Sequence, residues 1–293
     1  MNTNIINIFI VIIGIIFLVY VVYLFYLHLQ IKNKTVEYMN NLNNTKSSTV
    51  LILKTHSWNN RLEKFATKLL NETVPYNIDF YILMHSDDNS LINKIKNLDL
   101  IKHVLIFSQS DIKKMYDKGF YSMWLSNHWI LMWFFRQFKY QYYWSMEYDV
   151  RISGDSSRIW TYNGPEDFLY PIQPFQDRNW IWKNHYSGSI LNDDNKFYGY
   201  LQLARYSLKF LNYLEKYFQM GENGQDEMIV FSLYKKGSGE INLTGNHELL
   251  SKLINNSWSV NNKDSDKHRK MLIESNQKYL LDKNHLKIFH PLK

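Results

Sequence analysis

The sequence predicts an α/β fold in which a mixed, mostly parallel sheet is flanked by helices and preceded by one N-terminal transmembrane helix. The sheet is indicated by short apolar runs rich in β-branched and aromatic residues, at 49–54, 78–84 and 103–107. Segments of helical character separate these runs, and strands that alternate with helices are typical of parallel sheets with right-handed crossovers. The transmembrane helix is indicated by an uncharged apolar run over residues 8–27.

Residues 8–27 are long enough to span a membrane, because at about 1.5 Å per residue they cover roughly 30 Å, the thickness of a bilayer core. A cleaved signal peptide is the alternative, but it would have a basic start, a shorter apolar core and small residues at a cleavage site. The chain starts with uncharged Met-Asn-Thr-Asn, and bulky Tyr and Phe end the apolar run. We therefore expect a tail at 1–7, a membrane signal-anchor at 8–27, a polar stem or linker at 28–48 and one domain over 49–293.

Helices are expected between and after the strands. The segment 121–138 is apolar nearly all round, so a second membrane span is an alternative to a buried helix. Asn127, His128 and Arg136 interrupt the segment and leave too short an unbroken apolar stretch to cross a bilayer, which favours the buried helix. Further helices are expected at 60–71, 90–97, 203–219, from 226 to about 234 and at 264–281, and a further strand at 198–202.

Composition limits the classes of ligand. The net charge is +7, which suits an anionic ligand or an anionic surface. Nucleic acid would fit such a charge, but no helix-turn-helix, zinc-finger or ribonucleoprotein signature is present, so we expect no nucleic-acid partner. Cysteine is absent, which excludes disulfides and thiolate metal sites.

The segment 141–154 carries the strongest functional signal. A β-prone aromatic run ends in Glu147 and Asp149, and residues two apart on a strand point to the same face. Open α/β sheets bind ligands beyond the carboxyl ends of their strands. Two close carboxylates repel unless a cation neutralises them, and a divalent cation on a diphosphate is a natural partner. The alternative is a solvated strand end, with nearby Arg151 pairing either with a diphosphate or simply with Glu147.

Residues 144–150, Trp-Ser-Met-Glu-Tyr-Asp-Val, resemble the Asp-x-Asp motif of GT-A glycosyltransferases, and are similar to its Trp-x-x-Glu-x-Asp-Val variant in eukaryotic and large-virus families. The resemblance is sharp over 140–154 and looser over 49–293. It implies a GT-A-like sheet, and an enzyme that moves a sugar from a nucleotide-diphosphate donor to a glycan, protein or lipid acceptor. It also implies a Mn²⁺ or Mg²⁺ ion held by Glu147 and Asp149.

The chain end supplies a third candidate ligand. The sequence finishes with a β-like run followed by His290-Pro-Leu-Lys293, and a neutral imidazole is a common metal ligand. The resemblance implies that His290 completes the metal shell, and Lys293 would reach a phosphate of the donor as a point charge. The alternative is a frayed basic tail, the usual fate of a terminus. Four terminal residues are expected to contribute little to the core.

Asp226 and Glu227 are candidates for the catalytic base, because the resemblance implies an acid at a helix start in this later part of the domain. They follow Gly-Glu-Asn-Gly, where a helix is expected to begin. The alternative is that acids in a first turn merely offset the helix dipole and cap its amides. No physical argument from the sequence separates the two residues, although we favour Glu227 slightly.

Donor-binding residues are expected where the first two strands end. Lys54, Thr55 and His56 follow the first strand, while Asp87 and Asp88 follow the second and are equally suited to a turn. Arg205, at an expected helix start, is a weaker candidate on the acceptor side.

The rival class is a non-catalytic, membrane-anchored carbohydrate-binding protein on the same fold. The sequence has no Gly-x-Ser-x-Gly elbow, no Gly-rich phosphate loop followed by Lys-Ser/Thr, no His-Glu-x-x-His and no Gly-x-Gly-x-x-Gly. Hydrolysis by the Glu147/Asp149 pair is disfavoured, because retaining glycosidases need acids on opposite sides of the bond.

Two signals indicate opposite orientations of the domain relative to the membrane. Lys32 and Lys34 follow the anchor, and the positive-inside rule then favours a cytosolic domain. The resemblance implies the opposite, a type II protein of the endoplasmic reticulum or Golgi, or a protein of a viral membrane. The expected place is therefore a membrane crossed once, with either orientation open.

Overall fold

The computed structural model describes residues 47–87, 90–116, 124–177, 179–255 and 265–292, together with Leu18 and Ser122. Apart from Leu18 in the expected anchor and Ser47 and Ser48 at the end of the expected linker, these two segments lie outside the described residues. None of the helices within the described ranges is long and apolar enough to cross a membrane. The part of the chain from Ser47 onwards forms one compact unit.

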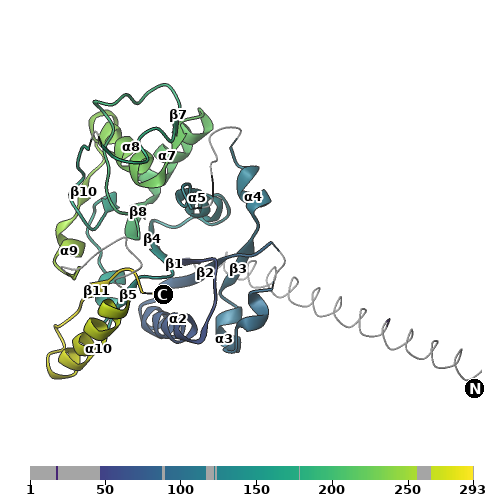
Figure 1. Cartoon of the computed structure of the whole chain (residues 1–293), viewed down its shortest axis with the longest axis vertical. Coiled ribbons are helices and arrows are strands. Elements are labelled where there is room, and N and C mark those ends of the chain that lie inside the picture. Colours follow the sequence, from purple (N-terminus) through teal and green to yellow (C-terminus); the bar gives the residue numbers. More distant parts are fainter. Residues whose placement is uncertain are drawn as a thin grey trace, which may run out of the picture. The chain divides into compact units, whose positions relative to one another are not determined.

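A seven-stranded sheet organises this unit (Figure 1). Its strands lie in the order β10-β6-β8-β4-β1-β2-β3. Strand β8 runs antiparallel to both of its neighbours, and the other pairs within the sheet are parallel. The predicted mixed, mostly parallel sheet is therefore confirmed. The strands are β1 (Thr49–Thr55), β2 (Asp79–His85), β3 (Val104–Phe107), β4 (Tyr142–Glu147), β6 (Phe168–Leu169), β8 (Leu203–Ser207) and β10 (Gly245–Asn246).

Helices cover both faces of the sheet because the central strands are buried on both sides (Figure 1). Leu51 and Leu53 of β1 share a core cluster with Phe65 and other residues of α2 (Asn60–Thr73). Tyr81 of β2 packs against Phe134 of α5 (His128–Gln137), with ring centroids 5.1 Å apart. Alternate residues thus serve opposite layers, as the pleat of a strand requires. Helices α7 (Leu208–Gln219) and α8 (Asp226–Glu240) lie in the layer of α5.

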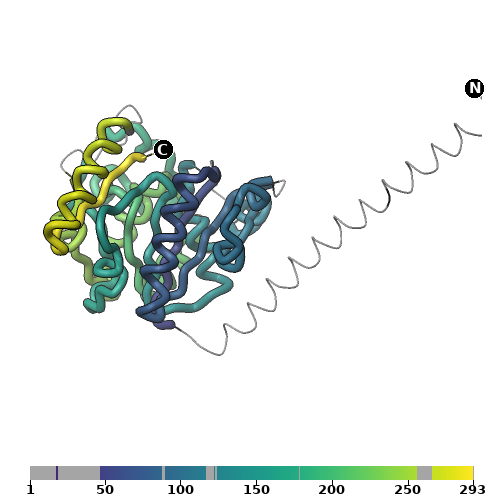
Figure 2. Tube along the Cα trace, turned by 90° about the horizontal axis from the view of Figure 1, so that it is seen from below, coloured from purple at the N-terminus to yellow at the C-terminus, as the bar shows by residue number. Residues whose placement is uncertain are grey.

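The remaining elements complete the unit. Helix α10 and the C-terminal segment run side by side along one flank, as Figures 1 and 2 show. These elements are η1 (Val74–Tyr76), η2 (Ile92–Lys94), α3 (Leu98–Ile101), α4 (Gln109–Lys113), β5 (Arg151–Ile152), α6 (Ser157–Trp160), β7 (Tyr186–Ser187), β9 (Asn223–Gly224), α9 (Glu248–Ser251), α10 (Ser265–Leu281) and β11 (Ile288–Phe289).

The helix predicted at 203–219 was wrong over its first five residues, which form strand β8. All five are buried, so the segment shows neither the alternation of a half-exposed strand nor a polar helical face. Arg205 lies within β8 and is fully buried, with its guanidinium donating to the carbonyls of Tyr162, Gly164 and Glu166 at 2.7–2.9 Å. It therefore anchors a loop, and the suggested acceptor-side role at a helix start was wrong.

Three other boundaries also differ from prediction. The strand predicted at 198–202 is reduced to an isolated bridge between Tyr198 and Phe175. The helix predicted at 90–97 is a single 3₁₀ turn, η2. Within 121–138, the regular helix begins only at His128, and it is buried along most of its length.

Candidate active site

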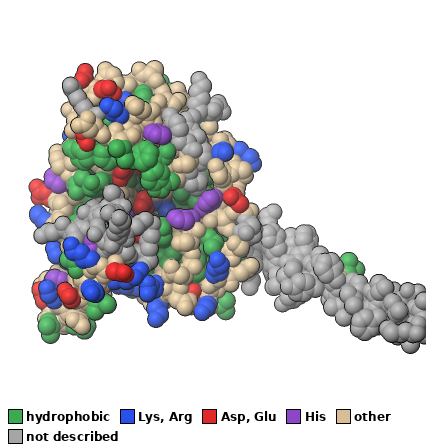
Figure 3. All heavy atoms as spheres, in the orientation of Figure 1, with side chains coloured by type: hydrophobic (Ala, Val, Ile, Leu, Met, Phe, Trp, Pro, Cys, Tyr) green, Lys and Arg blue, Asp and Glu red, His purple; other side chains and the backbone are tan. Residues whose placement is uncertain are grey.

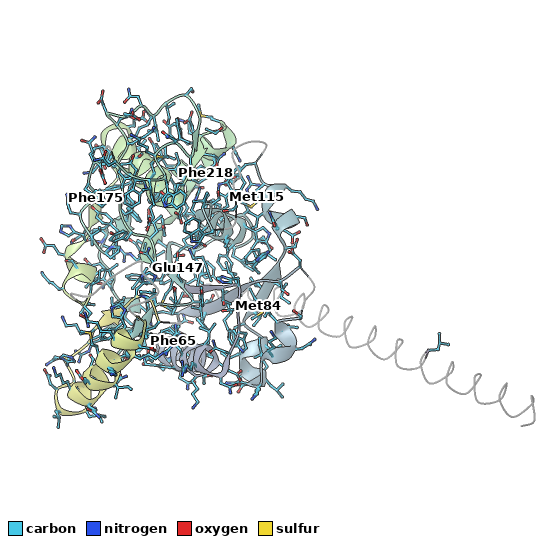
Figure 4. All side chains as sticks on the ribbon, in the orientation of Figure 1. Phe65, Met84, Met115, Glu147, Phe175 and Phe218 are labelled. Carbon is cyan, nitrogen blue, oxygen red and sulfur yellow. The ribbon has the colours of Figure 1, made fainter. Side chains whose placement is uncertain are left out.

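Glu147 is the last residue of β4 and lies at the carboxyl edge of the sheet, near the centre of the unit (Figure 4). Its backbone N–H donates to the carbonyl of Gln202 at 2.9 Å, which holds the strand end in place. Asn127 Nδ2 donates to Glu147 Oε1 at 2.7 Å. The chain then turns sharply, since Val150 N–H donates to the Glu147 carbonyl at 3.2 Å. This turn carries Asp149, which is buried.

The C-terminal segment brings His290 to this turn. Strand β11 pairs antiparallel with β5, with Phe289 opposite Arg151, so the following residues run back toward Asp149. Leu292 N–H donates to the Asp149 carbonyl at 2.7 Å, and His290 Nε2 lies 3.5 Å from Asp149 Oδ1. The alternative of a frayed tail is wrong for residues up to 292. Leu292 is only 3% exposed, so the expectation that the last residues add little to the core was also wrong.

Glu147, Asp149 and His290 form a candidate metal centre. Each offers one ligand atom, and these atoms all lie within 4.8 Å of one another. Two carboxylates and an imidazole suit Mn²⁺ or Mg²⁺, because carboxylate oxygens are preferred by hard cations and imidazole is a ligand for transition metals. Three protein ligands leave coordination positions for water or phosphate oxygens. The donor set therefore fits the ion that the sequence resemblance implies.

Lys54 sits beside the acids at the end of β1. It is the register partner of Glu147 across two neighbouring parallel strands, and it is buried. Burial lowers the pKa of Lys54, while the charges of Glu147 and Asp226 oppose that change. Burial raises the pKa of Glu147; Lys54 opposes this shift and Asp149 adds to it. The buried ammonium therefore offsets part of the negative charge of the site.

Asp226 and Glu227 form the first turn of α8 and face the same region. Gln202 Nε2 donates to Glu227 Oε1 at 2.9 Å, and the backbone carbonyl of Gln202 accepts from the Glu147 N–H. One residue therefore contacts both groups of acids. Burial raises the pKa of Asp226 to about 7, with Glu147 adding to the shift. Burial, followed by the charges of Asp226 and Glu147, raises the pKa of Glu227 well above its ordinary value.

The capping alternative is confirmed in part, because Asp226 Oδ1 accepts from the Glu227 N–H at 2.8 Å. The pKa shifts, however, have the opposite sign to those expected of acids that only offset the helix dipole. An acid that only offsets a helix dipole is stabilised in its charged form, so its pKa falls. Asp226 is 7% exposed and its pKa moves the other way. A carboxyl with a pKa near neutral pH is suited to accept a proton, which is the property that a general base requires.

Thr55 ends β1 and Asp87 follows β2, at the same edge of the sheet, but their environments differ. Thr55 is buried, and its hydroxyl donates to the Ser57 carbonyl at 2.5 Å. Asp87 is exposed and accepts from Gln109 N–H at 3.1 Å, which fits the turn alternative. Arg151 donates to the carbonyls of Tyr148 and Val150, and its guanidinium lies over the Phe65 ring at 4.7 Å. Asp88 and Lys293 lie outside the described residues.

Arg151 therefore supports the turn that carries Asp149. Its donor contacts go to backbone carbonyls of that turn. Burial lowers the pKa of Arg151 to about 10, and the charge of Asp149 opposes the shift. A direct contact of Arg151 with a diphosphate stays a prediction.

Sequence reasoning missed three polar residues of the site. Asn127 and His128 were noted only as interruptions of an apolar run, although buried polar residues in such a run are a signal of a specific role. His128 is 4% exposed, and burial next to Lys54 lowers its pKa to about 3, so its imidazole is neutral. Gln202 gave no signal, because its contacts depend on the pairing of β4 and β8.

Figure 3 shows the site from outside. Acidic side chains are visible in a hollow near the centre of this face, with a basic side chain beside them. Hydrophobic side chains gather along one side of the hollow, and histidines lie near it. The hollow is therefore lined by both charge and apolar surface.

No protein-family model matches the chain, and no curated protein sequence matches it. Among solved structures, it is similar to the inositol-1-phosphate CTP transferase from T. maritima, with 9% identity over 69% of this chain and 85% of the other, at a TM-score of 0.40. The glycosyltransferase GlyE of Streptococcus pneumoniae TIGR4 gives 10% identity, 84% and 55% coverage and a TM-score of 0.38.

A glycosyltransferase involved in the glycosylation of the major capsid of PBCV-1 gives 11% identity over 58% of this chain and 64% of the other, at a TM-score of 0.29. The structural neighbours are thus nucleotide-using and glycosyl transferases. At such low identities and TM-scores, the likeness establishes neither a shared family nor a shared activity. The resemblance of residues 144–150 to one motif variant stays a prediction.

His290 can be tested as a ligand by a single substitution. His290→Ala is expected to weaken Mn²⁺ binding by at least about tenfold, because it removes a direct donor, and even supporting groups contribute that much to metal affinity. Titration of Mn²⁺ followed by electron paramagnetic resonance measures the affinity. His285→Ala is the matched control, because it removes another imidazole of the C-terminal region that is not among the three candidate ligands. Its Nε2 lies 3.0 Å from Ser275 Oγ. Equal affinity of wild type and His290→Ala would remove His290 from the ligand set.

Proposed function

We propose that this chain is a metal-dependent glycosyltransferase that moves a sugar from a nucleotide-diphosphate donor to an acceptor hydroxyl. The observation that carries the proposal is the grouping of Glu147, Asp149 and His290 at the carboxyl edge of the parallel strands. Ligands of open α/β sheets bind at that edge. The second pair of acids, Asp226 and Glu227, stands at the start of a helix facing the same region.

The reaction would divide between these two groups of residues. A Mn²⁺ or Mg²⁺ ion, when bound, would stabilise the charge that develops on the leaving diphosphate. Glu147, Asp149 and His290 would orient the donor by holding that ion, and Lys54 would place a positive charge next to its phosphates. The acceptor oxygen forms a bond to the anomeric carbon, while the bond from that carbon to the phosphate oxygen breaks and its electron pair leaves with the diphosphate.

Asp226 or Glu227 would take the proton from the acceptor hydroxyl. The pKa of Asp226, raised to about 7, allows a fraction of the carboxylate at neutral pH and makes that carboxylate more basic than an exposed one. Gln202 and Gln225 donate to Glu227 at 2.9 and 3.2 Å, so its position is fixed. Asp226 Oδ1 also accepts from Gln225 Nε2 at 3.0 Å.

We further propose that residues 8–27 anchor the enzyme in a membrane. The support is the uncharged apolar length of this segment. The lumen of the endoplasmic reticulum or Golgi, or a viral membrane, would suit a type II arrangement, while the lysines after the segment favour the cytosolic one. The acceptor would be a glycan, a protein or a lipid.

The proposal is tested by nucleotide release. The full chain is incubated with a panel of uridine, guanosine and cytidine nucleotide sugars, with Mn²⁺, with Mg²⁺ or with EDTA. One donor is expected to release its nucleotide only with the metal, and to raise the melting temperature by several degrees through mass action. Absence of both effects across the panel would contradict the proposal. A carbohydrate-binding protein without activity would bind sugars but release no nucleotide.

A further inference from the structure

An exposed tryptophan, Trp124, and a half-buried one, Trp182, form an aromatic surface beside the candidate active site. Trp124 is 69% exposed, which is unusual for so large an apolar side chain. The ring of Trp182 meets it edge to face, with centroids 5.0 Å apart, and the ring of His185 continues the row at 5.3 Å from Trp182. We call Trp124, Trp182 and His185 the aromatic platform. Ile181, 76% exposed, neighbours it in sequence.

Backbone hydrogen bonds fix the platform to the helix that carries the candidate base. Asp226 N–H donates to the carbonyl of Leu125, the residue after Trp124, at 2.9 Å. Gln225 N–H donates to the carbonyl of His185, also at 2.9 Å. Both loops of the platform are thus bonded to consecutive residues at the start of α8. These bonds hold the backbone of both loops next to the acids at the start of α8.

The second loop is further held by close packing. Tyr186 of β7 pairs with Gly224 of β9, immediately before α8. A Cβ atom added at Gly224 would lie 2.8 Å from the His185 carbonyl, so the two backbones approach too closely for a side chain. Trp180, two residues before Trp182, also donates to Gln225 Oε1 at 3.4 Å. An aromatic surface held this firmly loses little conformational freedom when a ligand binds.

The chemistry of the platform and its neighbours identifies a class of ligand. Exposed aromatic faces suit the C–H face of a pyranose ring, and the nearby carboxylates accept hydrogen bonds from hydroxyl groups. Four acids lie in the adjoining site, Glu147, Asp149, Asp226 and Glu227, and they supply oxygen acceptors for the hydroxyl groups of a bound sugar. A glycan offers both the apolar C–H face and the hydroxyl groups.

We infer that Trp124 and Trp182 bind the acceptor, and that this acceptor is a glycan. The inference rests on the proposed glycosyl transfer for its catalytic meaning, and it selects one of the three acceptor classes, glycan, protein or lipid. A glycan ring on the platform would present a hydroxyl toward the start of α8, where Asp226 and Glu227 lie.

Binding is tested without the donor by saturation-transfer NMR. The full chain is mixed with methyl pyranosides of glucose, galactose, mannose and N-acetylglucosamine and with their neutral disaccharides. At least one is expected to show transfer to ring C–H protons. Trp124→Ala and Trp182→Ala should each weaken its binding by about tenfold, as loss of an aromatic contact predicts. Ile181→Ala is the matched control, because it removes an exposed apolar side chain from the same loop.

The outcomes separate this inference from the proposed function. Binding in wild type and in Asp149→Asn, with loss in the tryptophan variants, supports the platform whether or not sugar is transferred. Nucleotide release without binding of any glycan in the panel would overturn the platform and leave the transferase proposal standing. Binding that Trp124→Ala and Trp182→Ala leave unchanged would also overturn it, as would saturation transfer to a lysine-rich peptide in place of every glycan.

Discussion

Replacing Asp149 with asparagine is expected to lower metal-dependent sugar transfer by at least about 10³-fold, because a lost metal contact removes several kcal/mol of stabilisation of the developing charge. The fold should survive. Asparagine has the same size, and the backbone carbonyl of Asp149 that accepts from Leu292 N–H is unchanged. Donor hydrolysis measures the activity, and the affinity for the nucleotide should lose its dependence on Mn²⁺.

The control for Asp149→Asn is Asp99→Asn, which makes the same change of charge on an exposed side chain of α3. It should leave both activity and metal affinity unchanged. Melting temperatures of both variants in EDTA establish that each is folded. Transfer by Asp149→Asn at the wild-type rate would show that the centre formed with Glu147 and His290 is not where the metal acts.

Replacing Asp226 with asparagine is expected to reduce transfer by about 10²–10⁴-fold if Asp226 is the base, the usual contribution of a positioned proton acceptor. The same substitution should stabilise the metal-free protein at neutral pH. Asparagine keeps the Oδ1 acceptor used by Glu227 N–H and Gln225 Nε2. It removes a buried negative charge whose cost is shown by the pKa of about 7. Glu227→Gln, compared in parallel, decides which acid is the base.

The sign of the stability effect follows from proton linkage. Below pH of about 4 Asp226 is protonated in both the folded and unfolded protein, so it costs nothing. Between about 4 and 7 the unfolded chain releases the proton while the folded protein retains it, so wild-type stability falls as pH rises. The charged Asp226 side chain can lower the free energy of unfolding by at most about 4 kcal/mol. Relaxation of the protein around the charge should reduce this loss to about 1–2 kcal/mol, or several degrees in melting temperature.

Calorimetry of the two apo proteins across pH tests this directly. The gap between Asp226→Asn and wild type should be small near pH 4 and reach its maximum above pH 7. A gap that does not change with pH would mean that Asp226 ionises normally in the folded protein. In that case its role as a base with a raised pKa would be wrong, even if the substitution abolished transfer.

The sequence by itself determined the central strands and the first two acids of the site. Strands β1, β2 and β4 are continuous apolar or aromatic runs, and such runs are stable only where both faces are buried. Their alternation with helices then implies a parallel sheet, which places the residues after each strand at one edge. Glu147 and Asp149 could therefore be located by local pattern alone. The boundaries of β8 could not, because the polar residues Arg205 and Ser207 interrupt its apolar run and helix α7 begins directly after it.

Only the tertiary structure decided what surrounds these acids. His290 is 141 residues from Asp149 in sequence, and it arrives there because β11 pairs with β5 in one particular register. Lys54 becomes the buried partner of Glu147 through the parallel register of β1 and β4. The platform of Trp124 and Trp182 joins two loops through the start of α8. Each of these contacts depends on strand pairing and helix docking between residues far apart in the sequence. Local composition and periodicity carry no information about such pairings.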